Sequence, residues 1–142
     1  MRMFVDANVL FSAARSSGAI RTLLLMLQST GHALVADAYV VAEARRNLEA
    51  KAGADALAYL EGLFAQMEVR QVSYAEVAHE ESLVGWLPEK DRPVLLAAMA
   101  MQCDVLLTGD RTHFGAGYGK TFAGVMVYAP AQLARVLWLS PN

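Results

Sequence analysis

The chain has 142 residues, of which 56% are hydrophobic and 18% charged, and its formal net charge is −2 at pH 7. A chain of this size predicts one compact domain covering residues 1–142, with a single apolar core. The mildly acidic balance excludes nucleic-acid binding through bulk positive charge, but not the handling of a few phosphates through a metal and local arginines. The high apolar content favours a dimer or a bound partner.

Cysteine content and hydropathy indicate the compartment. Cys103 is the only cysteine of the sequence, so no internal disulfide is possible and a reducing compartment is favoured. It lies in an apolar run and is expected to be a small core residue. Asp6, Asn8 and Arg15 interrupt the N-terminal apolar segment, so no signal peptide is expected. No apolar run approaches the roughly 20 residues of a membrane helix. We therefore expect a cytoplasmic protein.

Short apolar runs alternate with helical patterns along the whole chain. Strands are expected at residues 2–5, 32–36, 68–72, 104–107 and 125–128. Helices are expected at residues 8–14, 18–29, 38–51, 54–67, 73–86, 93–102 and 131–138. Ser17 and Asp37 are expected N-caps, and the glycine-rich residues 111–123 are expected to form a loop. This alternation predicts an α/β fold with a parallel sheet covered on both faces.

Acidic side chains stand where the chain changes direction. They are Asp6, Glu43, Asp91 and Asp110. Asp6 and Asp110 follow directly on expected strands, and ligands of open parallel sheets bind beyond the carboxyl ends of the strands. Asp104 begins a strand and is therefore expected at the opposite end of the sheet. Gathered carboxylates repel one another unless a cation holds them, so the pattern predicts a divalent metal site.

Each of these acids also has a purely structural interpretation. Asp6 and Asp91 are well placed to cap the helices that follow them. Asp110 stands in a Thr-Gly-Asp sequence, where aspartate commonly stabilises a turn. Glu43 borders the apolar face of its helix, and a nearby arginine would serve as its partner as well as a metal. The residues alone leave both interpretations open.

Other chemistries fit the sequence less well. His32, His79 and His113 have no metal-ligand spacing with Cys103. His113 lies three residues after Asp110 and could face the pocket, but a surface role is expected. A phosphatase of the haloacid dehalogenase type would need a second aspartate at position 8, where this chain has Asn8. A nuclease acting on DNA and a non-catalytic binding module stay open.

Several segments resemble, in order, the motifs of PIN-domain nucleases. They are residues 4–13, 42–48, 91–98 and 106–114, followed by a last strand and helix at residues 124–133. No single segment is specific, but the ordered set spans essentially the whole chain. The chain is similar in size to the VapC-type toxins of type II toxin–antitoxin pairs. One departure is His113, which stands where many members carry another acid.

The resemblance implies a three-layer α/β/α sandwich with a mostly parallel central sheet, and a Mg²⁺- or Mn²⁺-dependent ribonuclease. By resemblance, the metal ligands and catalytic residues are Asp6, Glu43, Asp91 and Asp110. Asn8 and Thr108 would orient ligands or water, and Arg92 or Arg111 would contact a phosphate. A homodimer and an antitoxin that covers the site are also implied, with helices 18–29 and 54–67 as candidate docking surfaces.

Overall fold

A computed structural model describes residues 1–139, which contain a six-stranded sheet in the order β3-β2-β1-β4-β6-β5. The strands are β1 Arg2–Val5, β2 Ala33–Asp37, β3 Glu68–Arg70, β4 Val105–Leu107, β5 Thr121–Phe122 and β6 Val125–Tyr128. All neighbouring pairs are parallel except β5 with β6, which is antiparallel. The mostly parallel sheet expected from the sequence is confirmed.

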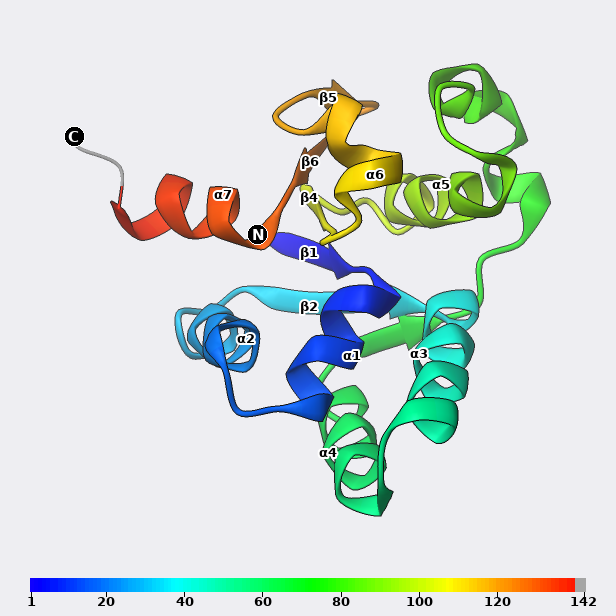
Figure 1. Cartoon of the computed structure of the whole chain (residues 1–142). Helices are drawn as coiled ribbons and strands as arrows, with labels where there is room; N and C mark the ends of the chain where they lie inside the picture. The colour runs from blue at the N-terminus through cyan, green and yellow to red at the C-terminus, as the bar shows by residue number, and fades with distance from the viewer. Residues whose placement is uncertain (140–142) are drawn as a thin grey trace.

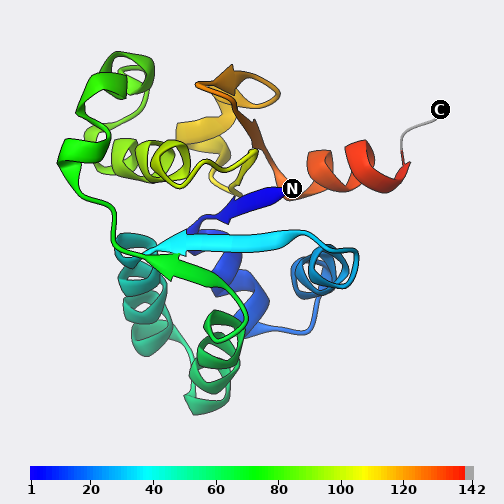
Figure 2. The same cartoon turned by 180° about the vertical axis from the view of Figure 1, so that it is seen from behind.

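Helices lie on both sides of the central strand β1. They are α1 Ala7–Arg15, α2 Ala19–Ser29, α3 Ala38–Lys51, α4 Ala54–Phe64, α5 Arg92–Ala100, α6 Arg111–Phe114 and α7 Pro130–Ala134. Helix α1 contacts α2, α3 and α4, and α5 packs on β4. Figures 1 and 2 show α1 to α4 gathered on one side of β1 and α5 and α6 on the other. This is the predicted α/β/α arrangement.

The register of the central strands determines which residues meet at the carboxyl edge of the sheet. Met3 pairs with Val105 and Val5 with Leu107, so β1 and β4 end level with each other. Apart from Arg2 at the start of β1, these strands are apolar and buried because helices cover both faces. The backbone N–H of Asp6 donates to the Leu107 carbonyl at 3.0 Å, which extends the pairing by one residue. The side chains that follow the two strands therefore come together.

The helix expected over residues 73–86 is wrong in type. The structure has two 3₁₀ segments there, η1 Tyr74–Glu76 and η2 Ala78–Val84. Glu76 accepts a hydrogen bond from the Ser73 backbone and forms an ion pair with Arg70, so polar contacts fix the first turn. Val77 is buried and has a φ of −123°, which interrupts the helical path. A third 3₁₀ segment, η3 Glu89–Asp91, leads into α5.

The prediction that residues 111–123 form a loop is also wrong. The segment contains α6, the 3₁₀ segment η4 Gly115–Gly117 and the strand β5. Aromatic packing organises it: Trp86 stacks on Phe122 with ring centroids 5.0 Å apart and meets buried Phe114 edge-on at 6.3 Å. The loop was predicted from glycine content, which carries no information about the packing of Phe114 and Phe122 against distant Trp86.

Helix ends differ from the expectation in smaller ways. The N-cap of α2 is Gly18 rather than Ser17, and it makes no side-chain cap. Helix α4 ends at Phe64, three residues before the expected end. The last helix, α7, ends at Ala134 and continues as a π-helical turn, η5 Arg135–Leu139. Asp37 caps α3 as expected, accepting from the Val40 backbone N–H at 3.1 Å.

Composition led to expectations about Cys103 and about membrane-spanning helices. Cys103 is buried, and burial raises the pKa of its thiol to about 12, so it is an inert core residue. No helix within residues 1–139 is long and apolar enough to cross a membrane.

Candidate metal centre

A pocket of about 320 Å³ lies at the carboxyl ends of β1 and β4. It is lined by Asp6, Ala7, Asn8, Glu43, Asn47, Lys90, Asp91 and Asp110. All the acids singled out in the sequence are therefore in one place, although they come from β1, α3, η3 and the end of β4. The strand ends supply two of them, as expected for an open parallel sheet.

Asp6 is held in a fixed orientation at the bottom of this pocket. Its side chain is only 5% exposed, and one carboxylate oxygen accepts from the Ala7 backbone N–H at 2.8 Å. The other accepts from the Thr108 hydroxyl at 2.8 Å and the Asn8 amide at 3.1 Å. Burial raises the pKa of Asp6 to about 6, and the charge of Glu43 adds to this, while the hydrogen bonds act in the opposite direction. A nearby cation would reverse the rise.

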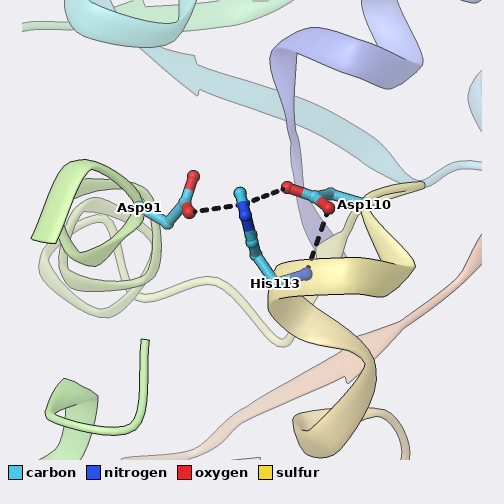
Figure 3. Close-up of side chains that lie close together, drawn as sticks. All are labelled: Asp91, Asp110 and His113. Carbon is cyan, nitrogen blue, oxygen red and sulfur yellow. Dashed lines mark hydrogen bonds and ion pairs between the residues drawn. The ribbon is translucent and has the colours of Figure 1, made fainter. Parts of the chain in front are cut away.

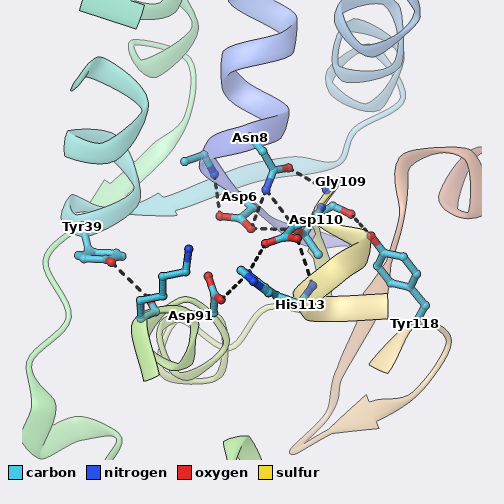
Figure 4. A network of polar contacts seen from close by, with 11 residues as sticks. Asp6, Asn8, Tyr39, Asp91, Gly109, Asp110, His113 and Tyr118 are labelled. Atoms are coloured by element: carbon cyan, nitrogen blue, oxygen red, sulfur yellow. Dashed lines mark hydrogen bonds and ion pairs between the residues drawn. The ribbon is translucent and has the colours of Figure 1, made fainter. Parts of the chain in front are cut away.

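Asn8 and Thr108 link the two strand ends, and Figure 4 shows Asn8 beside Asp6 and Gly109. The Asn8 side-chain oxygen accepts from the Gly109 backbone N–H at 2.7 Å. The Thr108 hydroxyl, which donates to Asp6, also accepts from the Asp110 backbone N–H at 3.2 Å. A side chain at position 109 would place its Cβ 3.2 Å from that Asn8 oxygen, so glycine permits the close approach. These contacts hold Asp6 and the two strand ends in one fixed arrangement; the orienting role of Asn8 and Thr108 stays a prediction.

Asp91 and Asp110 face each other across His113 (Figure 3). The Nδ1 atom of His113 lies 2.9 Å from Asp91 Oδ2 and 2.9 Å from Asp110 Oδ2. His113 is thus partly buried in the site, and the surface role expected for it is wrong. Asp91 is the N-cap residue of α5 but makes no side-chain capping hydrogen bond, so of its structural interpretation only the charge at the helix N-terminus is left. Asp110 does cap α6, accepting from the His113 backbone N–H at 3.1 Å.

The side chains of the site form a donor set that fits a divalent cation. Ligand atoms of Asp91, Asp110 and His113 all lie within 4.8 Å of one another. His113 Nδ1 and Asp91 Oδ2 are buried and, despite their close approach, neither makes an aligned hydrogen bond. Two carboxylates that crowd one ring nitrogen, with Asp6 and Glu43 in the same pocket, form an oxygen-rich set that a hard cation would satisfy. The residues fit Mg²⁺ or Mn²⁺.

Lys90 is a pocket residue that the sequence analysis missed. Among residues 1–139 it is the only lysine or arginine that lines the pocket with the acids. Its backbone carbonyl accepts from the Tyr39 hydroxyl at 3.3 Å, and Tyr39 lies one helical turn before Glu43 on α3. The lysine directly precedes Asp91, but local sequence gives no sign that its side chain turns toward the site.

The two arginines predicted to contact phosphate lie outside this pocket. The Arg92 guanidinium donates to the carbonyls of Leu87 at 2.9 Å and Gly85 at 3.3 Å, so it holds the preceding segment in place. Arg111 is exposed and lines a neighbouring hollow of about 470 Å³ together with Tyr118. Arg111 is therefore better placed than Arg92 for an incoming phosphate.

Comparison with solved structures reveals related folds. VapBC2 from Rickettsia felis, bound to a DNA fragment from its promoter, has a TM-score of 0.66 at 16% identity over 91% of this chain and 98% of that chain. VapC20 from Mycobacterium tuberculosis, a Sarcin-Ricin loop cleaving toxin, has a TM-score of 0.58 at 14% identity over 84% of this chain and 98% of that chain. FitAcB from Neisseria gonorrhoeae has a TM-score of 0.61 at 20% identity over 91% of this chain and 98% of that chain. At these identities the likeness shows a shared fold.

No protein-family model matches the chain, and no curated protein matches it.

Proposed function

We propose that this chain, which has the PIN-domain fold of VapC-type toxins, is a metal-dependent endoribonuclease and the toxin of a type II toxin–antitoxin pair. The observation that carries the proposal is the convergence of Asp6, Glu43, Asp91 and Asp110 on one pocket at the carboxyl ends of β1 and β4. Residues 1–142 would form a single nuclease domain that acts in the cytoplasm.

Asp6, Asp91 and Asp110 would hold Mg²⁺ or Mn²⁺, with Glu43 as a ligand directly or through water. When bound, the ion supplies polarisation of the scissile phosphate and a lower pKa for the attacking water. Hydrolysis would leave a 3′-hydroxyl and a 5′-phosphate. His113, placed between Asp91 and Asp110, would hold these carboxylates apart or join them as a ligand.

The chain's own residues would prepare the site before substrate arrives. The three hydrogen bonds to Asp6 fix its carboxylate, so no reorganisation is needed there. Lys90 would balance the negative charge of the phosphate in a pocket that is otherwise acidic. Arg111 would contact a neighbouring phosphate of the RNA strand.

An antitoxin and a second copy of the chain are the proposed partners. Helices α2 and α4 carry a hollow of about 370 Å³ that includes Leu25, Tyr59 and Leu63. Leu25 is 53% exposed and Met26 41%, which is unusual for side chains of this size in an isolated domain. These helices are candidate surfaces for an amphipathic segment of the antitoxin. Light scattering at tens of micromolar tests the homodimer.

A non-catalytic PIN-like module that binds RNA or a protein is the second candidate. The observation that favours it is the place of His113, because its Nδ1 atom already lies 2.9 Å from Asp91 and 2.9 Å from Asp110 without any ion. Such a module would fold normally and would show no metal-dependent cleavage.

The test is incubation of the purified chain with mixed-sequence RNA in EDTA, Mg²⁺ or Mn²⁺, with Asp6→Asn alongside. Asp104→Asn is the matched control, since Asp104 lies at the opposite end of the sheet, where it accepts from the Arg2 backbone N–H. Cleavage that requires metal and Asp6 but not Asp104 is the expected result. Cleavage by Asp6→Asn at the wild-type rate would refute the site. The same assay on DNA tests the preference for RNA.

A further inference from the structure

We propose that a groove beside the candidate metal centre binds one nucleobase of the RNA strand, and that Tyr39 is the side chain on which this base stacks. The inference rests on the proposed function, because the groove is assigned to the same substrate. It adds a base-recognition subsite to a centre that by itself would act only on the phosphodiester backbone.

The groove has a volume of about 330 Å³, within the range of roughly 300–1,000 Å³ typical of small-ligand pockets. It lies between the first turn of α3, the 3₁₀ segments η1 and η2, and the start of α5. Its lining is largely apolar and includes Tyr39, Tyr74, Val77, Pro93 and Leu96. A planar, mostly apolar group fits such a lining better than a hydrated, charged one.

The groove and the metal pocket share a wall. Tyr39 lines the groove, and its hydroxyl donates to the carbonyl of Lys90, a residue that lines the metal pocket. Arg92 lines the groove directly after Asp91 in the chain. In Figure 4, Tyr39 and His113 lie on opposite sides of Asp91. A nucleotide whose phosphate lies at the metal centre therefore has the groove beside it.

Aromatic side chains at the mouth of the groove favour a base. Tyr39 is 41% exposed and Tyr74 63%, and both belong to segments that face each other across the groove. Exposed aromatic rings beside a nucleic-acid path are stacking platforms, because every base offers a π-face. The Tyr74 hydroxyl donates to Glu81 at 2.9 Å, which restrains that side chain.

The charges of the groove argue against a phosphate there. Its ionisable side chains are Asp37, Glu81 and Arg92, besides the two tyrosines. The Arg92 guanidinium is directed to the Leu87 and Gly85 carbonyls, as described above. Asp37 is buried and caps α3, whereas exposed Glu81 has a second carboxylate oxygen beside the one that accepts from Tyr74. That oxygen suits the amino and ring N–H groups of a base, and both carboxylates repel a phosphate. We therefore assign the groove to a base that presents N–H donors.

The test is calorimetric titration of the whole chain, in Mg²⁺, with the four ribonucleoside 5′-monophosphates and with ribose 5-phosphate. All five probes share the phosphate and the sugar, so the difference between them isolates the base. We expect at least one nucleotide to bind about tenfold more tightly than ribose 5-phosphate, in line with the contribution of a single stacked base. Tyr39→Ala should abolish this difference, and Tyr39→Phe, which keeps the ring, should retain it.

Equal affinity of the wild-type chain for ribose 5-phosphate and all four nucleotides would overturn the proposal, whatever Tyr39→Ala does to folding. So would a preference for one nucleotide that survives Tyr39→Ala. RNA cleavage measured on the same preparations separates this proposal from the nuclease. Cleavage without base-dependent binding would overturn the groove and leave the nuclease. Base-dependent binding that needs Tyr39, in a chain that does not cleave, would support the groove and count against the nuclease.

Discussion

At the residue scale, Asp6 combines burial with negative charge. It is 5% exposed, and its hydrogen-bond donors only partly offset the cost of removing a carboxylate from water. The metal-free protein therefore keeps an unfavourable charge at the end of its central strand. Such strain is typical of sites where a bound ligand later supplies the compensation.

Asp6→Asn is expected to stabilise the metal-free protein at pH 8 by roughly 1–3 kcal/mol. A pKa raised from 3.8 to about 6 corresponds to roughly 3 kcal/mol, and the amide loses part of this because it has one acceptor fewer. The pKa of Asp6 is higher in the folded chain than in the unfolded chain. The destabilisation by its buried charge is therefore fully present above about pH 6 and disappears as the pH falls toward 4. Chemical denaturation in EDTA at pH 8 and pH 4 measures it. A difference that grows toward pH 4 would contradict this account.

Lys90→Met is expected to change cleavage and metal affinity in opposite directions. Removal of the only cation lining the acidic pocket within residues 1–139 should strengthen Mn²⁺ binding, because one repulsive charge is lost. The same change should slow cleavage by about 100-fold, as expected when one stabilising group for developing charge is removed. Mn²⁺ titration and RNA cleavage assays on one preparation measure both. Lys120→Met, in an exposed loop, is the control, and parallel losses of affinity and rate would indicate a merely structural role.

At the element scale, packing of the β5 and α6 region depends on Trp86. A Cβ at Gly117 would lie 2.4 Å from the Trp86 ring, which is itself held between Phe114 and Phe122. The indole cannot move aside without breaking those contacts. Glycine at position 117 is therefore required by close approach.

Gly117→Ala is expected to lower the free energy of unfolding by about 1–3 kcal/mol through overpacking against Trp86. Gly62→Ala is the matched control, because Gly62 lies within α4 with no atom within 4 Å of an added Cβ. There the same substitution should stabilise the helix by about 0.5–1 kcal/mol. Urea denaturation of both variants measures the pair. Equal changes in the free energy of unfolding at the two positions would show that the Trp86 ring moves aside and that no overpacking occurs.

Sequence patterns predicted those elements whose signal is local. β1 and β6 were found with their observed bounds because apolar runs between breakers are enough to identify a buried strand. The segments around Val77 and Phe114 were not, since the first depends on a side-chain ion pair between Arg70 and Glu76 and the second on an aromatic contact with distant Trp86.

The candidate site divides in the same way. Asp6 and Asp110 could be found from their place after strands, and their meeting follows from the parallel register. His113 and Lys90 could not, because the direction of a side chain in a short helical turn is set by tertiary packing. His113 reaches Asp91 only because α6 stands beside the start of α5.

At the scale of the whole molecule, metal binding should be visible as stability. If Mg²⁺ or Mn²⁺ binds only the folded chain, an ion concentration one hundred times the Kd adds about 2.7 kcal/mol. For a chain of this size that raises the Tm by about 5–10 °C. Thermal melts with metal and with excess EDTA measure the shift. Asp110→Asn should abolish it and Asp104→Asn should keep it; a metal effect that survives Asp110→Asn would place the ion elsewhere.

The pairing of β1 with β4 has a consequence for synthesis. Asp6 and Glu43 leave the ribosome early, but Thr108 and Asp110 follow only after most of the chain has been made. β4 must then pair with β1, a slow step because it joins residues about one hundred positions apart, and β6 adds to β4 afterwards. A nascent chain that ends before residue 110 therefore carries Asp6 and Glu43 without the complete centre. If the chain cuts RNA, it would acquire this activity only after Asp110 has left the ribosome and β4 has paired with β1.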